Sequence, residues 1–285
     1  MSTVMRMSTL ERAVDRGWRI FGTGLSFVAF GVGGALLSFT VFPLIRLASS
    51  RETAGRRIRC VLHQAFRLHI WLMHSFGLNS LEVHGRERLL RPGQLIVANH
   101  PTLIDIVHLM ALVPDADCVV KRGLWRNPFL RWPVVWAGYI PNSSDSETLV
   151  RDCAETLRSG RTLIVFPEGT RTPPGQPMRL KRGAAQIALA AGCDVVPVSI
   201  VCQPLTLTKA DPWYRVPPVT AHFTITVFPP VSARAYQREN ETNSIAARHL
   251  TAFMAAQFAR GAEMAPRAQL PATAAVTPRA VPPGL

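Results

Sequence analysis

The chain has 285 residues, 48% of them hydrophobic, so it is long enough to bury a core of its own. Its 32 Lys and Arg residues against 18 Asp and Glu residues give a net charge of +14, which fits either a generally basic surface or a contact with nucleic acid, an anionic membrane or anionic substrates. The five cysteines are odd in number and form no Cys-x-x-Cys pair, which argues against a disulfide framework or a zinc site and favours reduced thiols in the cytoplasm.

A long uncharged segment, residues 20–45, follows a basic N-terminus. As a helix it would be about 39 Å long, enough to cross a hydrocarbon core of roughly 30 Å. Three interpretations remain: a membrane-spanning helix, which is preferred, a helix that enters and leaves one leaflet, or a cleaved signal peptide. Pro43 and several glycines favour the second. A slight excess of Arg after the segment places its C-terminal side in the cytoplasm.

Residues 56–78 show apolar positions at helical spacing, with Arg and His between them. This pattern predicts a basic amphipathic helix. Such a helix either lies on a membrane surface or packs against the core of the following domain, and the sequence does not decide between the two.

From about residue 81 onward, short apolar segments alternate with helical ones. The predicted strands are residues 80–85, 94–100, 118–123, 162–169, 194–201 and 223–231. Helices are predicted over residues 181–192 and 243–260, the second with Ser244 as its cap. Strands that alternate with helices indicate an α/β domain.

Three parts of the chain follow from these patterns. Residues 1–78 are predicted to form N-terminal membrane-anchoring or interfacial helices. Residues 79–261 are predicted to form the α/β domain. Residues 262–285 are rich in Ala and Pro without apolar periodicity, so they are predicted to be a disordered tail.

The stretch VANHPTLIDI places His100 five positions before Asp105, directly after a predicted strand. Positions five apart on a regular helix point about 140° away from each other, so the pair can meet only if His100 lies outside the helix that Pro101 begins. A carboxylate bonded to one imidazole nitrogen would fix the tautomer and leave the other nitrogen to accept a proton. The pair is therefore a candidate general base, although a histidine bonded only to a backbone carbonyl has the same spacing.

A second polar loop, VFPEGTR, also follows a predicted strand directly. It carries Glu168, Gly169, Thr170 and Arg171. Ligands gather at the carboxyl ends of strands in α/β sheets, where Gly169 allows a close backbone approach and Arg171 offers a fork for phosphate or carboxylate. Alone, such a loop could equally be a solvated connection.

Taken in order, NHPTLID, GYIPNS, FPEGTR, and LKRGAA with VVPVSI resemble the four blocks of the glycerolipid acyltransferases, the 1-acylglycerol-3-phosphate O-acyltransferase-like group. The resemblance covers about residues 81–228. It implies a glycerolipid-acyltransferase-like αβ domain with an N-terminal membrane-associating helical segment.

The reaction that the resemblance implies moves a fatty acyl group from acyl-CoA or acyl carrier protein to a lipid hydroxyl. His100 would be the catalytic base and Asp105 its orienting partner. Glu168, Gly169, Thr170 and Arg171 would bind the acceptor and hold the site. Pro197, in the fourth block, would belong to the acyl-donor side.

The second block departs from the family's pattern. Residues 142–144 stand where the family has an arginine that contacts the acceptor phosphate, and the next arginine is Arg151 on the following helix. Lys121, Arg122, Arg171 and Lys181 are the other cations available. The expected acceptor is therefore 1-acyl-glycerol-3-phosphate, with a lyso-ornithine lipid, a lysophospholipid or another hydroxylated lipid as the alternative.

The expected partners are membrane lipids and acyl-CoA or acyl carrier protein, with no cofactor beyond that co-substrate, no metal and no nucleic acid. The expected location is a bacterial-type inner membrane, with the catalytic domain on the cytoplasmic side. Other hypotheses are a catalytically silent membrane-binding homologue, a hydrolase that uses water as the acceptor, and a nucleic-acid-binding protein suggested by charge alone.

Overall fold

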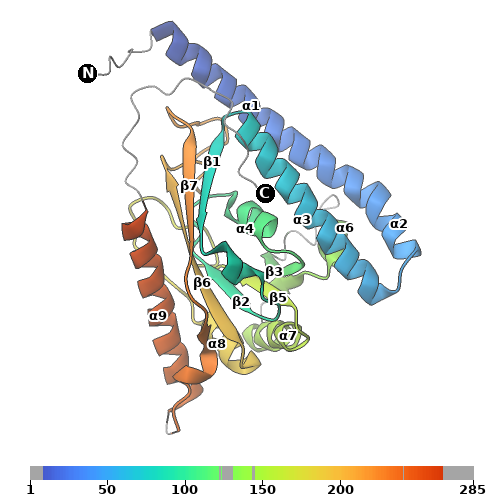
Figure 1. The fold of residues 1–285 in the computed structure, drawn as a ribbon, viewed down its shortest axis with the longest axis vertical. Helices are drawn as coiled ribbons and strands as arrows, with labels where there is room; N and C mark the ends of the chain where they lie inside the picture. The colour runs from blue at the N-terminus through green and yellow to red at the C-terminus, as the bar shows by residue number, and fades with distance from the viewer. Residues whose placement is uncertain (1–8, 122, 124–130, 143–144, 240, 266–285) are drawn as a thin grey trace.

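The computed structural model describes residues 9–121, 123, 131–142, 145–239 and 241–265. They form an eight-stranded mixed sheet with helices on both faces, which confirms the predicted α/β fold (Figure 1). Along the sheet the order is β1-β7-β6-β2-β5-β3-β4, and β8 pairs with β6. The strands are β1 Asn79–His84, β2 Leu95–Ala98, β3 Ala116–Lys121, β4 Ile140–Asn142, β5 Thr162–Val165, β6 Asp194–Gln203, β7 Ala221–Val227 and β8 Val231–Ser232.

The short strand β2 lies in the middle of the sheet and runs parallel to both of its neighbours, β5 and β6. All of its residues are buried, because helices cover both faces. Side chains alternate along a strand, so Ile96 and Ala98 belong to the core on one face, and Leu95 and Val97 to the core on the other. Because β2 is buried on both faces, its position in the sheet is fixed, and so is the start of the loop that follows it.

Each face of the sheet has its own set of helices. The helices are α1 Thr9–Leu36, α2 Phe42–Leu47, α3 Arg51–Ser75, α4 Asp105–Leu112, α6 Arg131–Ala137, α7 Ser146–Arg158, α8 Gly183–Ala191 and α9 Asn243–Met264. On the Ile96 face the core is shared with α3 and α4, and on the opposite face with α7, α8 and α9. Gly261 lets α9 approach β6 closely, since a Cβ at that position would lie 2.2 Å from the Cβ of Ser199.

The uncharged N-terminal segment forms a nearly continuous helix. A π-helical turn, Leu37–Val41, joins α1 to α2 and accommodates Pro43 in the first turn of α2. Together they make Leu10–Leu47 long and apolar enough to cross a membrane, by length and composition only. The chain then reverses, and α3 lies beside α1 along one side of the domain (Figure 1).

The described helices bear on the two interpretations of residues 56–78. One face of α3 packs into the domain core through Ile58 and Ile70. Its other face leaves Leu68 and Trp71 exposed. The core-facing interpretation therefore holds for one side of α3, and the exposed side is mixed, with Arg56, Arg57 and Gln64 as well as the two apolar residues.

Two predicted boundaries at the C-terminus were wrong. The last helix begins after Thr242 as its N-cap, so Ser244 lies inside the helix and is not the cap. It ends at Met264, so its last turn extends into the segment predicted to be a tail. The last turn is packed, since Gly261 lies next to Ser199 and Phe228 and the C-cap Ala265 is buried. The rest of the predicted tail, residues 266–285, lies outside the described residues.

Candidate active site

The candidate site lies at the carboxyl ends of β2 and β5, where their connections diverge. The chain leaving β2 passes through α4 on one face to β3, beyond β5. The chain leaving β5 passes through α8 on the opposite face to β6, beyond β2. Adjacent parallel strands whose connections go to opposite faces leave a crevice between them, and this is where α/β folds bind ligands.

His100 and Asp105 meet at this point. The distance from His100 Nδ1 to Asp105 Oδ2 is 2.9 Å, and the imidazole is 18% exposed. With the Nδ1 proton directed to the carboxylate, Nε2 of the neutral ring carries the lone pair. Among the described residues Nε2 has no hydrogen-bond partner. The arrangement can therefore accept a proton from a bound hydroxyl.

The carboxylate of Asp105 is completely buried and bonded on both oxygens. The backbone N–H of Thr102 donates to Oδ2 at 2.7 Å, and the Thr102 hydroxyl donates to Oδ1 at 2.5 Å. Burial raises the pKa of Asp105, while the bonds from His100 and Thr102 act in the opposite direction. Three donors thus hold this carboxylate in one orientation against His100.

The helix after His100 begins later than predicted. Residues 101–104 form a turn, and α4 starts at Asp105, so Pro101 does not occupy its first turn. The N–H groups of Thr102 and Leu103 are bonded instead to the Asp105 carboxylate and to the Leu207 carbonyl. This turn brings His100 back over Asp105 without the two residues sharing a helix.

Glu168 holds the backbone of His100. Its Oε1 accepts the His100 N–H at 2.7 Å, and its Oε2 accepts the Thr172 hydroxyl. The ring of Phe166 stacks on the imidazole with centroids 4.3 Å apart. Glu168 is buried, so the structure uses this predicted acceptor-binding residue to join the β5 loop to the β2 loop.

Arg171 is also bonded inside the protein. Its Nη1 donates to the carbonyls of Leu207 and Thr208, each at 3.0 Å. The Leu207 carbonyl accepts the Leu103 N–H as well, at 3.0 Å. A third segment, residues 204–220 between β6 and β7, is thereby attached to both predicted motifs.

Gly169, Thr170 and Lys181 form the exposed rim of the β5 loop. Gly169 has φ +70°, a conformation that favours glycine, and a Cβ there would lie 3.1 Å from Lys181 Nζ. The N–H of Lys181 donates to the Pro167 carbonyl at 2.9 Å. Unlike Glu168 and Arg171, these three predicted substrate-binding residues are exposed to solvent.

The remaining predicted positions belong to other elements or lie outside the described residues. Lys121 ends β3, beyond β5, and its side chain is not among those described. Arg122 and residues 143–144 also lie outside the described part of the chain. Arg151 is on α7 as predicted, exposed and paired with Asp152. Pro197 is buried within β6, opposite Val97.

Several residues of the site were not predicted. Thr102, Phe166 and Thr172 stand inside or next to the two motifs, and their proximity to His100 or Glu168 was the available signal. The side chain of Asn99 donates to the Ile200 carbonyl at 2.8 Å and accepts the Ile200 N–H at 2.6 Å, continuing the pairing of β2 with β6 beyond its last residue. The Leu207 carbonyl carried no sequence signal.

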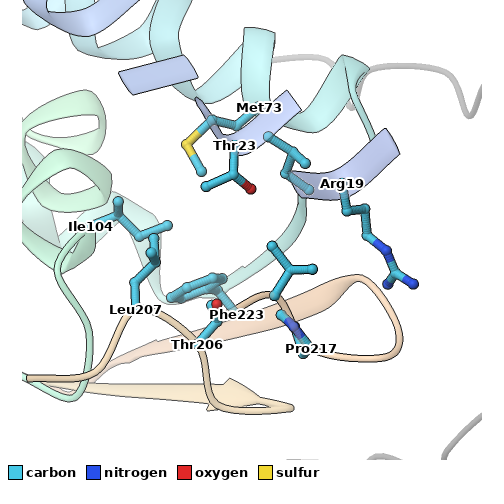
Figure 2. A pocket seen from close by; sticks show the side chains of 10 residues that line it. Arg19, Thr23, Met73, Ile104, Thr206, Leu207, Pro217 and Phe223 are labelled. Carbon is cyan, nitrogen blue, oxygen red and sulfur yellow. The ribbon is translucent and has the colours of Figure 1, made fainter. Parts of the chain in front are cut away.

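A small pocket lies beside the Leu103–Leu207 contact. Figure 2 shows Thr23 of α1 and Met73 of α3 facing Ile104, Leu207 and Phe223. The pocket is mostly apolar, and it separates the N-terminal helices from the loop that follows His100. Among the described residues no group of three or more His, Cys, Asp or Glu side chains could hold a metal ion.

Both the sequence and the fold are similar to those of known proteins. A family model described as Acyltransferase matches residues 80–201. The 1-acyl-sn-glycerol-3-phosphate acyltransferase of Pseudomonas aeruginosa is 28% identical over 204 residues, which cover 70% of this chain and 72% of that protein. The lyso-ornithine lipid O-acyltransferase of the same organism is 35% identical over 134 residues, which cover 46% of this chain and 51% of that protein.

Other relatives with the first of these names match over less than two thirds of their own length. Among solved structures, the 1-acyl-sn-glycerophosphate (LPA) acyltransferase PlsC from Thermotoga maritima superposes with a TM-score of 0.65 at 21% identity. The match covers 87% of this chain and 98% of that one, so the two chains share a fold over most of their length.

Proposed function

Because a family model described as Acyltransferase matches residues 80–201, we propose that this chain transfers a fatty acyl group from acyl-CoA or acyl carrier protein to the free hydroxyl of a membrane lyso-lipid. The observation that carries the proposal is the His100–Asp105 pair at the carboxyl end of β2, in which Nε2 has no hydrogen-bond partner among the described residues. The proposal needs no cofactor other than the acyl donor.

In the proposed reaction, His100 Nε2 takes the proton from the acceptor hydroxyl as its oxygen attacks the thioester carbonyl. Asp105 holds Nδ1 and stabilises the imidazolium that forms. Collapse of the tetrahedral intermediate breaks the carbon–sulfur bond, and the proton on Nε2 passes to the departing thiolate. The base is restored, and the products are an ester and a free thiol.

The acceptor that we propose is 1-acyl-glycerol-3-phosphate, the substrate in the name of the Pseudomonas aeruginosa relative that matches most of this chain. A second candidate is a lyso-ornithine lipid, favoured by the 35% identical relative. Two features of the site support a lyso-ornithine lipid as the second candidate acceptor. Residues 142–144 contain no arginine, and Nη1 of Arg171 is bonded to carbonyls. The exposed Lys181 beside Gly169 is the cation we assign to an acceptor phosphate.

We also propose that the N-terminal helices associate with the inner membrane, with the α/β domain on the cytoplasmic side. The outward face of α1 is apolar and exposed, while Arg19 and Thr23 on its inward face are buried against the domain. A helix attached to the domain along its inward face is arranged to lie in the surface of one leaflet rather than to extend away from the domain. This favours the second of the three sequence interpretations of residues 20–45.

The division of the chain at residue 78 remains a proposal of the same kind. It is supported by α1–α3 preceding the sheet, which begins with β1 at Asn79.

The decisive test is acyl transfer by the purified, detergent-solubilised chain and its His100→Ala variant. Labelled acyl-CoA and acyl carrier protein would be offered with lysophosphatidate and lyso-ornithine lipid. Loss of the base should lower turnover at least roughly 100-fold with the fold intact. His249→Ala, which alters an exposed histidine on α9, is the matched control and should keep the full rate.

A His100→Ala variant with near-normal turnover would remove His100 from the mechanism. A wild-type chain that transfers nothing would indicate a catalytically silent homologue.

A further inference from the structure

The connection between β6 and β7, residues 204–220, is long for an antiparallel pair. Most hairpin connections have about 2–5 residues, and irregular loops longer than roughly 12–15 residues usually have a function. We call residues 204–220 the β6–β7 loop. Its contacts run in two directions, to the candidate active site and to the N-terminal helix.

On one side the β6–β7 loop holds the two catalytic motifs. The Leu207 carbonyl accepts from Leu103 N–H and from Arg171 Nη1, and the Thr208 carbonyl accepts from Arg171 Nη1 again, each at 3.0 Å. Leu103 lies in the turn between His100 and Asp105. A displacement of the loop therefore displaces the turn that positions the base.

On its other side the β6–β7 loop contacts α1. The buried Arg19 donates from Nη2 to the Pro218 carbonyl at 2.6 Å and also pairs with Asp15. The ring of Trp213 packs over Gly24, where a Cβ would lie 3.2 Å from the indole. Figure 2 shows Arg19 and Thr23 of α1 facing Pro217 and Thr206 of the loop across the pocket.

The part of the loop next to α1 exposes two aromatic side chains. Trp213 is 49% exposed and Tyr214 is 56% exposed, with ring centroids 5.8 Å apart in an edge-to-face arrangement. Lys209 and Arg215 on the same loop are exposed cations. Amphipathic aromatic rings with basic neighbours are typical of the boundary between lipid and water.

The exposed aromatic pair lies at the edge of the apolar face of α1. At about 100° per residue, Trp18 and Gly24 lie about 120° apart around the helix. The sector between them holds the exposed residues Val14, Phe21, Leu25, Val28 and Val32. Trp18 borders this sector on one side, and Trp213, packed on Gly24, borders it on the other. The loop thus continues the apolar surface of the helix.

We propose that the β6–β7 loop is a second lipid contact, in which Trp213 and Tyr214 enter the headgroup region of an anionic membrane beside α1. Through the Leu207 and Thr208 carbonyls, this contact positions Arg171 and the His100 turn for an acceptor that lies in the membrane. The inference rests on the proposed function for its lipid acceptor, but the lipid contact itself can be measured without any activity.

The first experiment measures quenching of tryptophan fluorescence in the full chain by vesicles of phosphatidylcholine and phosphatidylglycerol with brominated acyl chains. The wild-type chain and Trp213→Phe would be compared, so that their difference reports Trp213 alone. The proposal requires brominated lipid to quench this difference emission and to shield it from iodide in the water. Difference emission that iodide still quenches, and brominated lipid does not, would overturn the proposal.

The second experiment compares acyl transfer to a long-chain acceptor in vesicles with transfer to a short-chain acceptor below its micelle concentration. In Trp213→Ala/Tyr214→Ala the ratio of the two rates should fall about tenfold, because two rings no longer leave water at the membrane. Ile245→Ala, which truncates an exposed apolar side chain on α9, is the control and should keep the wild-type ratio. An unchanged ratio in the double variant contradicts the proposal.

A loss confined to acyl carrier protein as donor, and absent with acyl-CoA, would instead assign the loop to a protein partner and overturn the lipid contact. If the proposed function is wrong, the wild-type chain will transfer an acyl group to neither acceptor. The quenching experiment does not depend on activity, so it will still show whether Trp213 contacts lipid.

Discussion

The side chain of Glu168 uses both of its oxygens inside the protein, one on the backbone N–H of His100 and one on the hydroxyl of Thr172. In the proposed reaction, a carboxylate bonded in this way acts on the acceptor only through His100, whose backbone it holds. Glu168 is therefore a positioning residue, and its negative charge matters less than its ability to accept a hydrogen bond.

A pair of substitutions tests that role. Glu168→Gln keeps an acceptor oxygen for His100, so turnover should stay within about tenfold of wild type, whereas Glu168→Ala leaves a buried N–H unpaired and should cost roughly 10- to 100-fold. The loss should fall on kcat, with the KM for the acceptor lipid little changed. Steady-state kinetics on both variants provide the measurement. If Gln is as damaging as Ala, or if KM rises instead, Glu168 contacts the substrate directly.

How much of the site could be predicted depended on where each partner stands in the chain. His100 and Asp105 are close in sequence, and the need for a carboxylate beside an imidazole indicated their contact. The roles assigned to Glu168 and Arg171 came from motif position, which says nothing about what their side chains contact. Their partners are a backbone N–H and two loop carbonyls, groups that every residue carries and that no sequence pattern distinguishes.

At the scale of single elements, α4 carries a buried group that titrates. His108 is fully buried in α4, with Nδ1 3.0 Å from the Ile104 carbonyl and Nε2 3.4 Å from the Asn79 side chain. Both contacts suit a neutral ring, and burial lowers its pKa from 6.5 to about 4. The element that begins at Asp105 is therefore sensitive to acid.

This sensitivity predicts a pH dependence of stability. The unfolded chain binds a proton at His108 below about pH 6.5, and the folded chain only below about pH 4. The neutral His108 therefore makes its full contribution to the free energy of unfolding above pH 6.5. This contribution is lost as the pH falls toward 4, and the free energy of unfolding then changes by up to about 1.4 kcal/mol per pH unit. His108→Asn cannot titrate, and its unfolding free energy in detergent should lack this slope relative to wild type. Parallel curves for the two proteins between pH 4 and 6.5 would contradict the assignment.

The predicted strands illustrate what local sequence can establish about elements. Each apolar segment proposed as a strand from residue 80 onward contains one, because β-branched residues and flanking glycines mark strands independently of their neighbours in space. The start of α4 was missed because it depends on Leu207, about a hundred residues later, which accepts the N–H of Leu103. A helix boundary that depends on a partner far along the chain cannot be predicted from the local sequence.

At the scale of the whole molecule, the exposed apolar residues are concentrated on α1 and α2, with Leu68 and Trp71 of α3 beside them. A patch of this kind on one side of a domain marks an interaction surface. The sequence indicated an apolar helix here, but it could not show which face of that helix the domain covers.

The outward face of α1 can be altered without touching the domain. Phe21 and Val28 are each 59% exposed, so Phe21→Asp/Val28→Asp should preserve the fold while placing two charges where lipid is proposed. We expect flotation of the full chain with anionic vesicles to fall at least about tenfold. Ile245→Asp on α9, away from α1, should float like wild type. Undiminished flotation of the double variant would show that α1 is not the membrane contact.

The contacts that complete the site also determine when it can form during synthesis. Glu168 follows His100 by 68 positions, and Ile200 follows Asn99 by 101, so the loop that carries His100 does not have all of its partners until β6 has left the ribosome. By then α1 and α3 have long been made, with their apolar sides uncovered. Contacts so distant in sequence form slowly, since a large loop must close for each. A growing chain therefore presents the apolar surface of its N-terminal helices well before the contacts of the candidate site are complete. Under the proposed function, acyl transfer would begin only in molecules that have already had time to reach the membrane.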